Sequence, residues 1–171
     1  MNVQVGRLPI GNLGYKAASF QAWDAAIYQQ NAGNDADWSG LYIAEVEATA
    51  KGYLPDYAGD NGNGVGYIHR ASLTQELQLI TCLDESFKRG DIDMPALKQS
   101  IRDKGIQVAD DELLIPKLGQ LGYCFRCYNN EEGAIEVIVP NSLAQHIAMN
   151  AIQRCTIKQY EVQSCQAIQF N

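Results

Sequence analysis

One carboxylate in the sequence is placed as if to act on a substrate. Glu136 lies within residues 134–139, which read AIEVIV. If this stretch is a strand, Glu136 shares one face with Ala134 and Ile138, and its other neighbours face the opposite way. A strand can hold a carboxylate rigidly in a cleft, where its charge acts in a low dielectric. Periodicity alone favours a plainer alternative, a half-buried strand with Glu136 in solvent.

Two tyrosines suggest a binding slot. Tyr42 ends the segment WSGLY, and Tyr53 ends the segment KGY. The first should lie on a strand over residues 40–45, and the second at the end of a short helix over residues 46–51. Two such rings facing each other suit a flat, positively charged ring, through stacking and cation–π attraction. Either tyrosine alone is more simply explained as an aromatic at the edge of the core.

These residues carry a resemblance to a known family. Residues 35–44 read DADWSGLYIA, and residues 48–53 read ATAKGY. This block resembles the NAD-binding segment of the diphtheria toxin and exotoxin A class of mono-ADP-ribosyltransferases, in which D-x-W-[KR]-G-F-Y leads through a short helix to G-Y. Residues 64–69, GVGYIH, look like the strand that follows the family's flexible loop. Residues 135–138, followed by Leu143 and Ala144, look like the strand of its catalytic glutamate. The resemblance spans about residues 14–144.

The resemblance implies a fold and a reaction. The fold is α+β, with two packed and mainly antiparallel sheets and flanking helices around an NAD cleft, in a single catalytic domain over residues 1–171. The reaction moves ADP-ribose from NAD⁺ to a protein nucleophile and releases nicotinamide. In this scheme Tyr42 and Tyr53 sandwich the nicotinamide ring, while backbone groups near Gly14 and Tyr15 hold its amide. Glu136 binds the 2′-hydroxyl of the nicotinamide ribose and stabilises the oxocarbenium ion.

The same resemblance implies partners and a setting. The partners are NAD⁺, as substrate, and a host or target-cell protein, as acceptor; no metal is expected. The protein would be a bacterial toxin or effector, secreted or injected, that acts in the cytosol of a recipient cell. Whether the chain is a complete injected effector or a fragment of a larger toxin stays open.

Lys16 departs from the family pattern. The family opens with Tyr-His-Gly-Thr, whereas residues 14–18 read GYKAA, so Lys16 stands where histidine is expected. Lysine can donate to a ribose hydroxyl or reach a pyrophosphate, but as a mobile point charge. Neither His69 nor His146 is expected to replace the missing histidine. We therefore expect Lys16 to contact NAD⁺ in a substituted but working site.

Ala134 bears on the acceptor. Arginine-modifying relatives carry Glu or Gln two residues before the catalytic glutamate, where this chain has Ala134. The resemblance therefore implies an acceptor other than arginine, with residues 119–133 forming much of the surface that meets the target.

Three alternatives remain open at this stage. Water as the acceptor would make the protein an NAD⁺ glycohydrolase. The departure at Lys16 allows a catalytically inactive relative that serves as a binding module. The third alternative is a plain α+β interaction domain in which the tyrosines and Glu136 share no cleft.

Composition sets further limits. The 171 residues include 13 Lys and Arg against 20 Asp and Glu, a net charge of −7, and 46% are apolar. This is the composition of a folded domain, and its acidity argues against nucleic acid or an anionic membrane as partner. No stretch reaches the roughly 20 apolar residues of a membrane helix, and no signal peptide is readable. The five cysteines are irregularly spaced, which favours reduced thiols, with Cys124 and Cys127 on opposite faces of a strand.

The elements that must position these residues follow from periodicity and turn residues. Helix 17–30 rests on Phe20, Trp23 and Ile27 falling on one face, with Gly33 near its end. A surface loop is expected at 54–64 and a hairpin turn at 129–133. The absence of regular strand–helix alternation favours an α+β fold with antiparallel sheets. Strands are expected at 3–5, 40–45, 65–72, 77–82, 122–128, 134–139, 156–163 and 166–170, and helices at 17–30, 46–51, 94–104 and 111–117.

Overall fold

The structure, a computed structural model, describes residues 1–26 and 35–170. Within these residues the strands form a nine-stranded sheet in the order β1-β5-β6-β7-β3-β2-β4-β8-β9. Neighbouring strands are antiparallel except β5 and β6, which are parallel. The predicted α+β class is confirmed. The strands are β1 (Gln4–Leu8), β2 (Gly11–Ala18), β3 (Leu41–Ala44), β4 (Gly64–Leu73), β5 (Leu77–Cys82), β6 (Tyr123–Tyr128), β7 (Ile135–Val139), β8 (Ile147–Lys158) and β9 (Glu161–Ala167).

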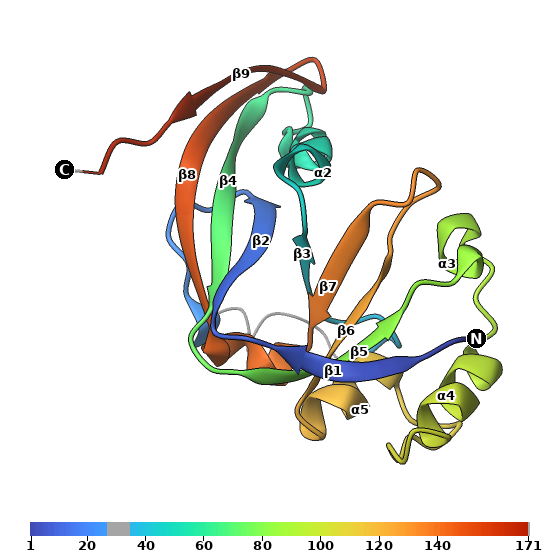
Figure 1. Ribbon diagram of the computed structural model, residues 1–171. Coiled ribbons are helices and arrows are strands. Elements are labelled where there is room, and N and C mark those ends of the chain that lie inside the picture. Colours follow the sequence, from blue (N-terminus) through green and yellow to red (C-terminus); the bar gives the residue numbers. More distant parts are fainter. Residues whose placement is uncertain (27–34, 171) are drawn as a thin grey trace.

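The sheet bends into two halves. Figure 1 shows β2, β4, β8 and β9 on one side of the molecule and β3, β7, β6, β5 and β1 on the other. The halves meet between β2 and β3, whose register has one pair, Tyr15 opposite Ala44. The expectation of two separate packed sheets is therefore wrong, because this contact joins all the strands into one sheet. Gly14 permits it: a Cβ atom there would lie 2.2 Å from the carbonyl oxygen of Ala44.

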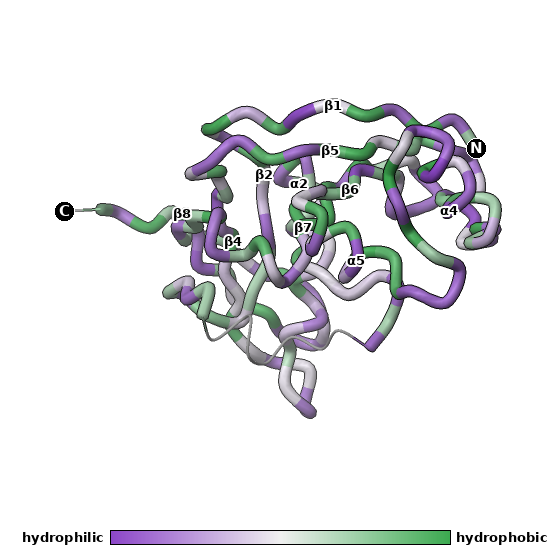
Figure 2. Tube along the Cα trace, turned by 90° about the horizontal axis from the view of Figure 1, so that it is seen from below, coloured by the Kyte–Doolittle hydropathy of each residue, from purple (hydrophilic) through white to green (hydrophobic). Residues whose placement is uncertain are grey.

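Short helices complete the fold. They are α2 (Glu47–Gly52), α3 (Glu85–Arg89), α4 (Met94–Arg102) and α5 (Leu114–Gln120), with two 3₁₀ turns, η1 (Leu54–Tyr57) and η2 (Asn141–His146). Leu97 of α4 and Leu118 of α5 pack on Phe125 of β6 in one core cluster. A second cluster covers the other face of β3 and β7, and a third lies under α2 and η1. Figure 2 shows hydrophobic residues along β7 and α5, whereas the edge strand β1 is mixed.

The elements that carry Tyr42, Tyr53 and Glu136 lie close to their predicted positions, unlike β2, which carries the other expected site residues. Strand β3, helix α2 and the β6–β7 hairpin match the expected elements at 40–45, 46–51, 122–128 and 134–139. Strands β4 and β5 and helix α4 are also confirmed. Helix α5 begins three residues later than predicted. Pro116 does not interrupt it, because it falls in the first turn, where a missing N–H costs no helical hydrogen bond.

The predicted helix 17–30 is wrong over residues 17–24, whereas residues 25 and 26 are helical. Ala17 and Ala18 end β2, and residues 19–24 form no helix; residues 27–34, which include Ile27 and Gly33, lie outside the described residues. Phe20 packs against the ring of His69 in β4, and the indole N–H of Trp23 donates to the carbonyl of Ile147. Helix-like aromatic spacing thus arises here from an irregular segment fixed onto the sheet.

The C-terminal strands were predicted out of place. Strand β8 begins at Ile147 rather than at 156, and β9 ends at Ala167. The two-residue turn between them consists of Gln159 and Tyr160, both at positive φ (53° and 60°). Such a turn usually contains Gly or Asn, so these residues gave no turn signal. Strand β2 and helix α3 were not predicted at all.

The cysteines are partly as expected. Cys124 and Cys127 are buried in different core clusters on the two faces of β6, which confirms the prediction for this pair. Cys155 and Cys165, however, form a disulfide between β8 and β9, so reduced thiols were wrong for them. The two residues are directly opposite each other in the register of β8 with β9. The pairing was not predicted because the predicted strand boundaries were wrong.

Candidate functional site

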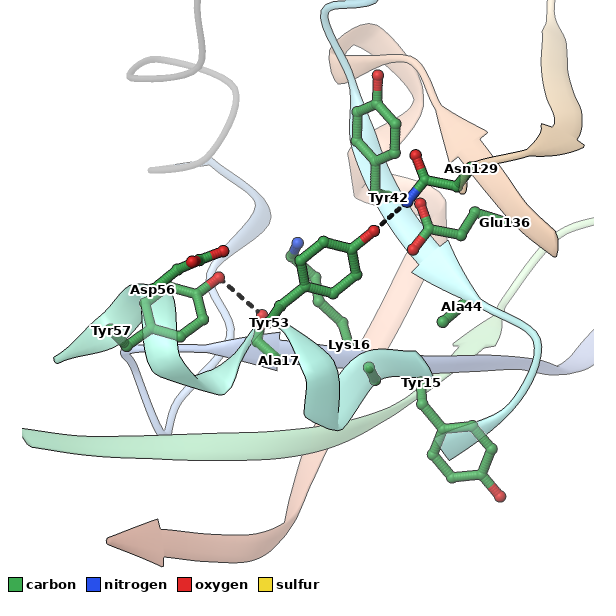
Figure 3. A pocket seen from close by; sticks show the side chains of 11 residues that line it. Tyr15, Lys16, Ala17, Tyr42, Ala44, Tyr53, Asp56, Tyr57, Asn129 and Glu136 are labelled. Atoms are coloured by element: carbon green, nitrogen blue, oxygen red, sulfur yellow. Dashed lines mark hydrogen bonds between the residues drawn. The ribbon is translucent and has the colours of Figure 1, made fainter. Parts of the chain in front are cut away.

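A pocket forms where the two halves of the sheet diverge beneath α2 (Figure 3). Its volume is about 380 Å³. It receives side chains from β2, β3, the α2–η1 segment and the β6–β7 hairpin. The lining residues are Tyr15, Lys16, Ala17, Tyr42, Ala44, Ala50, Tyr53, Asp56, Tyr57, Asn129 and Glu136.

Five of the six residues expected to form the site line this pocket. The exception is Gly14, which is buried beside it, against Ala44 of β3. Tyr15 lines the pocket, but Figure 3 shows its ring pointing away from Glu136. The guanidinium of Arg70 lies 5.8 Å from the centre of the Tyr15 ring. The alternative in which the tyrosines and Glu136 share no cleft is therefore contradicted.

Glu136 is only 1% exposed. Strand β7 lies between β3 and β6, with Glu136 opposite Ala44 and Cys127, so the solvent-facing alternative is wrong. Burial raises the pKa of the Glu136 carboxyl. Hydrogen bonding from Tyr53, the charge of Lys16 and hydrogen bonding from Asn129 each act to lower this pKa. Its buried Oε2 atom has no hydrogen-bond partner among the described residues.

The two tyrosines reach the pocket from different elements. Tyr53 caps the C-terminus of α2, and its hydroxyl accepts a hydrogen bond from the Asn129 amide. Burial, followed by the nearby charge of Glu136, raises the pKa of Tyr53. Tyr42 lies on β3, and its hydroxyl donates to the carbonyl of Trp38 at 2.9 Å. Figure 3 shows the Tyr53 hydroxyl directed at Asn129 and Glu136.

Lys16 brings a positive charge to the same pocket. Burial lowers the pKa of its amine, and the charge of Glu136 acts in the opposite direction. Its neighbour across the strand pair is His69, a fully buried residue whose Nε2 lies 2.8 Å from the carbonyl of Phe20. Neither His69 nor His146 is among the lining residues.

Sequence reasoning missed three polar lining residues. Asp56 and Tyr57 belong to η1, in a segment predicted to be a surface loop. The Tyr57 hydroxyl donates to the carbonyl of Ala17 at 3.0 Å, which ties η1 to β2. Asn129 was assigned to the hairpin turn, and only the hairpin register, in which its N–H donates to the carbonyl of Ala134, turns it toward Glu136. A polar residue directly flanking a hairpin turn was the one available signal.

The pocket combines groups that suit an organic ligand with charges of both signs. Phenol rings favour a flat cationic ring, the Lys16 ammonium favours an anionic group, and a buried carboxylate stabilises positive charge developing nearby. No cluster of three or more His, Cys, Asp or Glu able to hold a metal occurs in residues 1–26 and 35–170. In the same residues, no helix has the length and apolar character needed to cross a membrane.

Comparison with known proteins adds no family to this description. No protein-family model matches the chain, and a search of the curated proteins finds no match.

Proposed function

We propose that this protein is an NAD⁺-dependent protein mono-ADP-ribosyltransferase. The observation that carries the proposal is the convergence of Tyr42, Tyr53 and Glu136, from three separate segments, on one pocket that also holds Lys16. A buried carboxylate, one oxygen of which has no partner in the described part of the chain, lies next to phenol rings and supports chemistry on a cationic ring attached to a sugar. The bent sheet, with its pocket between the halves, supports an ADP-ribosyltransferase-like fold over residues 1–171.

The residues divide the work of binding. Tyr42 and Tyr53 hold the nicotinamide ring, and the backbone near Gly14 and Tyr15 binds its amide, which fixes the glycosidic bond in a reactive orientation. Lys16 contacts a ribose hydroxyl or the pyrophosphate.

Glu136 acts on the bond that breaks. The carboxylate accepts a hydrogen bond from the 2′-hydroxyl of the nicotinamide ribose. As the bond between C1′ and the ring nitrogen breaks, its electron pair leaves with nicotinamide, and the ribose becomes an oxocarbenium ion. Glu136 stabilises this cation, which exists only near the transition state, so the interaction goes into rate. The acceptor then bonds to C1′ and releases its proton.

The acceptor proposed is a protein residue other than arginine. Ala134 supports this, because it brings neither a carboxylate nor an amide to the position two residues before Glu136. We propose further that the protein is a secreted or injected bacterial effector whose target is a protein in the recipient cell. The Cys155–Cys165 disulfide supports passage through an oxidising environment.

A variant at Glu136 tests the proposal. Glu136→Gln keeps the shape of the side chain and removes its charge. We expect it to bind NAD⁺ like the wild type, by isothermal titration, and to lose about 10²–10³ in the rate of nicotinamide release. Wild-type rates in this variant, or no nicotinamide release from the wild type at any concentration, would exclude the proposed reaction.

NAD⁺ glycohydrolysis is the second candidate, and the same Ala134 favours it, since water needs no acceptor-binding side chain. The two reactions separate when labelled NAD⁺ is incubated with a cell lysate. Transfer predicts a labelled protein band that Glu136→Gln abolishes, whereas hydrolysis predicts nicotinamide release and no band.

A further inference from the structure

Asn129 lines the candidate site, but the proposed reaction gives it no role. It is the first residue after β6, and its backbone N–H donates to the carbonyl of Ala134 at 2.8 Å. Its side-chain amide donates to the hydroxyl of Tyr53. It lines the pocket of Glu136 and also two adjoining cavities, one toward Trp38 and one toward α2. Its amide group therefore lies in the same pocket as the Glu136 carboxylate, beside it.

The groups around Glu136 explain why such an amide matters. From β2 it faces the ammonium of Lys16, from β6 the thiol of Cys127, and from the end of α2 the hydroxyl of Tyr53. Tyr42 on β3 lines the same pocket. Burial favours the neutral acid, and Lys16 is itself destabilised as a cation by burial. Hydrogen-bond donors are therefore needed to keep the carboxylate ionised.

The Tyr53 hydroxyl and the Asn129 amide lie beside the carboxylate and are placed to be those donors. Both lower the pKa of Glu136 through hydrogen bonding, and Figure 3 shows the three polar groups meeting at one point. A phenol hydroxyl has one proton to give. Because the Asn129 amide donates to the Tyr53 oxygen, that proton remains directed at the carboxylate. Oε2 of Glu136 is buried and has no hydrogen-bond partner among the described residues, so part of the carboxylate's capacity to accept hydrogen bonds is unused.

We infer that Asn129 is a positioning residue, whose amide orients the Tyr53 hydroxyl and the ionised Glu136 carboxylate so that the carboxylate accepts from the ribose 2′-hydroxyl. The inference rests on the proposed function for the identity of the ligand. The donor arrangement itself exists in the free protein, where it can be measured without turnover.

The chain offers matched variants for this test. Asn129→Ala removes the amide. Asn129→Asp keeps its shape but replaces a donor by an acceptor. The control is Asn130→Ala, because Oδ1 of Asn130 accepts from the N–H of Ala134 at 2.9 Å within the same turn. The control therefore perturbs the hairpin without removing a donor to Tyr53 or Glu136.

The primary measurement is the pKa of Glu136 in the free protein. Carboxyl ¹³C resonances of labelled glutamates are followed against pH, and Glu136→Gln assigns the signal. We expect Asn129→Ala to raise the pKa by about one unit, a tenfold gain in proton affinity, and Asn129→Asp to raise it further. Asn130→Ala should leave it unchanged. An unchanged pKa in both Asn129 variants, or an equal shift in Asn130→Ala, overturns the inference.

Kinetics supply the second measurement. The ionised form of Glu136 is the active one, so raising its pKa moves the acidic limb of the nicotinamide-release profile to higher pH. Both Asn129 variants should show this displacement with reduced kcat and little change in KM, whereas Asn130→Ala should not. A change in KM alone contradicts a positioning role. If the titration behaves as expected but the wild type releases no nicotinamide, the donor arrangement is supported and the proposed function fails.

Discussion

Two buried charges in this protein are treated in opposite ways. Lys98 of α4 is 4% exposed, and its ammonium donates to the carbonyls of Asp110 and Glu112 at 3.1 and 2.6 Å. It also lies 3.4 Å from the carboxylate of Asp37. Glu136 is at least as buried, but its Oε2 has no partner among the described residues. The Lys98 ammonium therefore joins neighbouring segments through its contacts, whereas the Glu136 carboxylate keeps unused capacity to accept hydrogen bonds.

The difference is a guide to function. A buried charge whose hydrogen-bonding capacity is used up stabilises the fold and has nothing left for a ligand. A buried charge left partly unsatisfied destabilises the fold, and such groups cluster where ligands bind or react. If this contrast holds, changes at Lys98 will lower stability without altering chemistry, whereas Glu136→Gln will abolish chemistry without lowering stability at neutral pH.

The largest effect should come from Lys98→Met. This change keeps the apolar stem but removes the donor to the carbonyls of Asp110 and Glu112. It also removes the cation beside Asp37, whose Oδ1 still accepts from the N–H of Leu114. We expect a loss of about 3 kcal/mol in the free energy of unfolding, measured by urea denaturation. NAD⁺ affinity of the folded fraction should not change. Wild-type stability in this variant would mean that the contacts of Lys98 do not stabilise the fold.

The aromatic pair should give the next largest effect. Tyr42→Ala and Tyr53→Ala each remove a ring from the pocket, and we expect each to weaken NAD⁺ binding about tenfold by isothermal titration. Tyr128→Ala, which removes a ring outside this pocket, is the control. Unchanged affinity in both pocket variants would rule out the sandwich.

Lys16 should have a smaller effect on the same measurement. Lys16→Met keeps most of the volume and removes the charge, and we expect NAD⁺ affinity to fall several-fold, more at low than at high salt. Because burial already disfavours the ammonium, this variant should unfold at no lower a temperature than the wild type. If Lys16→Met binds NAD⁺ with wild-type affinity, residues 14–18 do not belong to the NAD⁺ site.

The pH dependence of stability should show the smallest effect, but its sign is diagnostic. The pKa of Glu136 is raised in the folded state, so folding binds this proton more tightly. Its contribution to stability is fully present below the unfolded pKa and is lost as pH rises through the folded pKa. The wild type should therefore lose stability relative to Glu136→Gln as pH increases over that interval. Urea titrations of both proteins at a series of pH values give the slope, and a slope of opposite sign would refute a buried, destabilised carboxylate.

The site could be predicted from the sequence where single segments carry it. Tyr42 and Tyr53 lie on consecutive elements at a fixed interval in the sequence. Their relative position could therefore be predicted even though other elements were predicted wrongly. Glu136 was located by an alternating strand pattern and by resemblance. Its burial was not foreseeable, because which face of β7 is covered depends on β3 and β6.

The remaining features depend on contacts that local patterns do not encode. Asn129 joins the site only through the register of the β6–β7 hairpin, and the Cys155–Cys165 disulfide only through that of β8 with β9. Phe20 and Trp23 have helical spacing, but tertiary packing on β4 and β8 overrides it.

The width of the pocket depends on the absence of a side chain at residue 14. Residue 14 has no side chain, and this lets β2 approach β3 so closely that a Cβ atom there would lie 2.2 Å from the carbonyl oxygen of Ala44. Lys16 on one wall and Tyr42 on the other are thereby held at a separation set by backbone contact instead of by adjustable side chains. A methyl group added at residue 14 would collide with the Ala44 carbonyl, force β2 away from β3 and so change the separation of Lys16 and Tyr42.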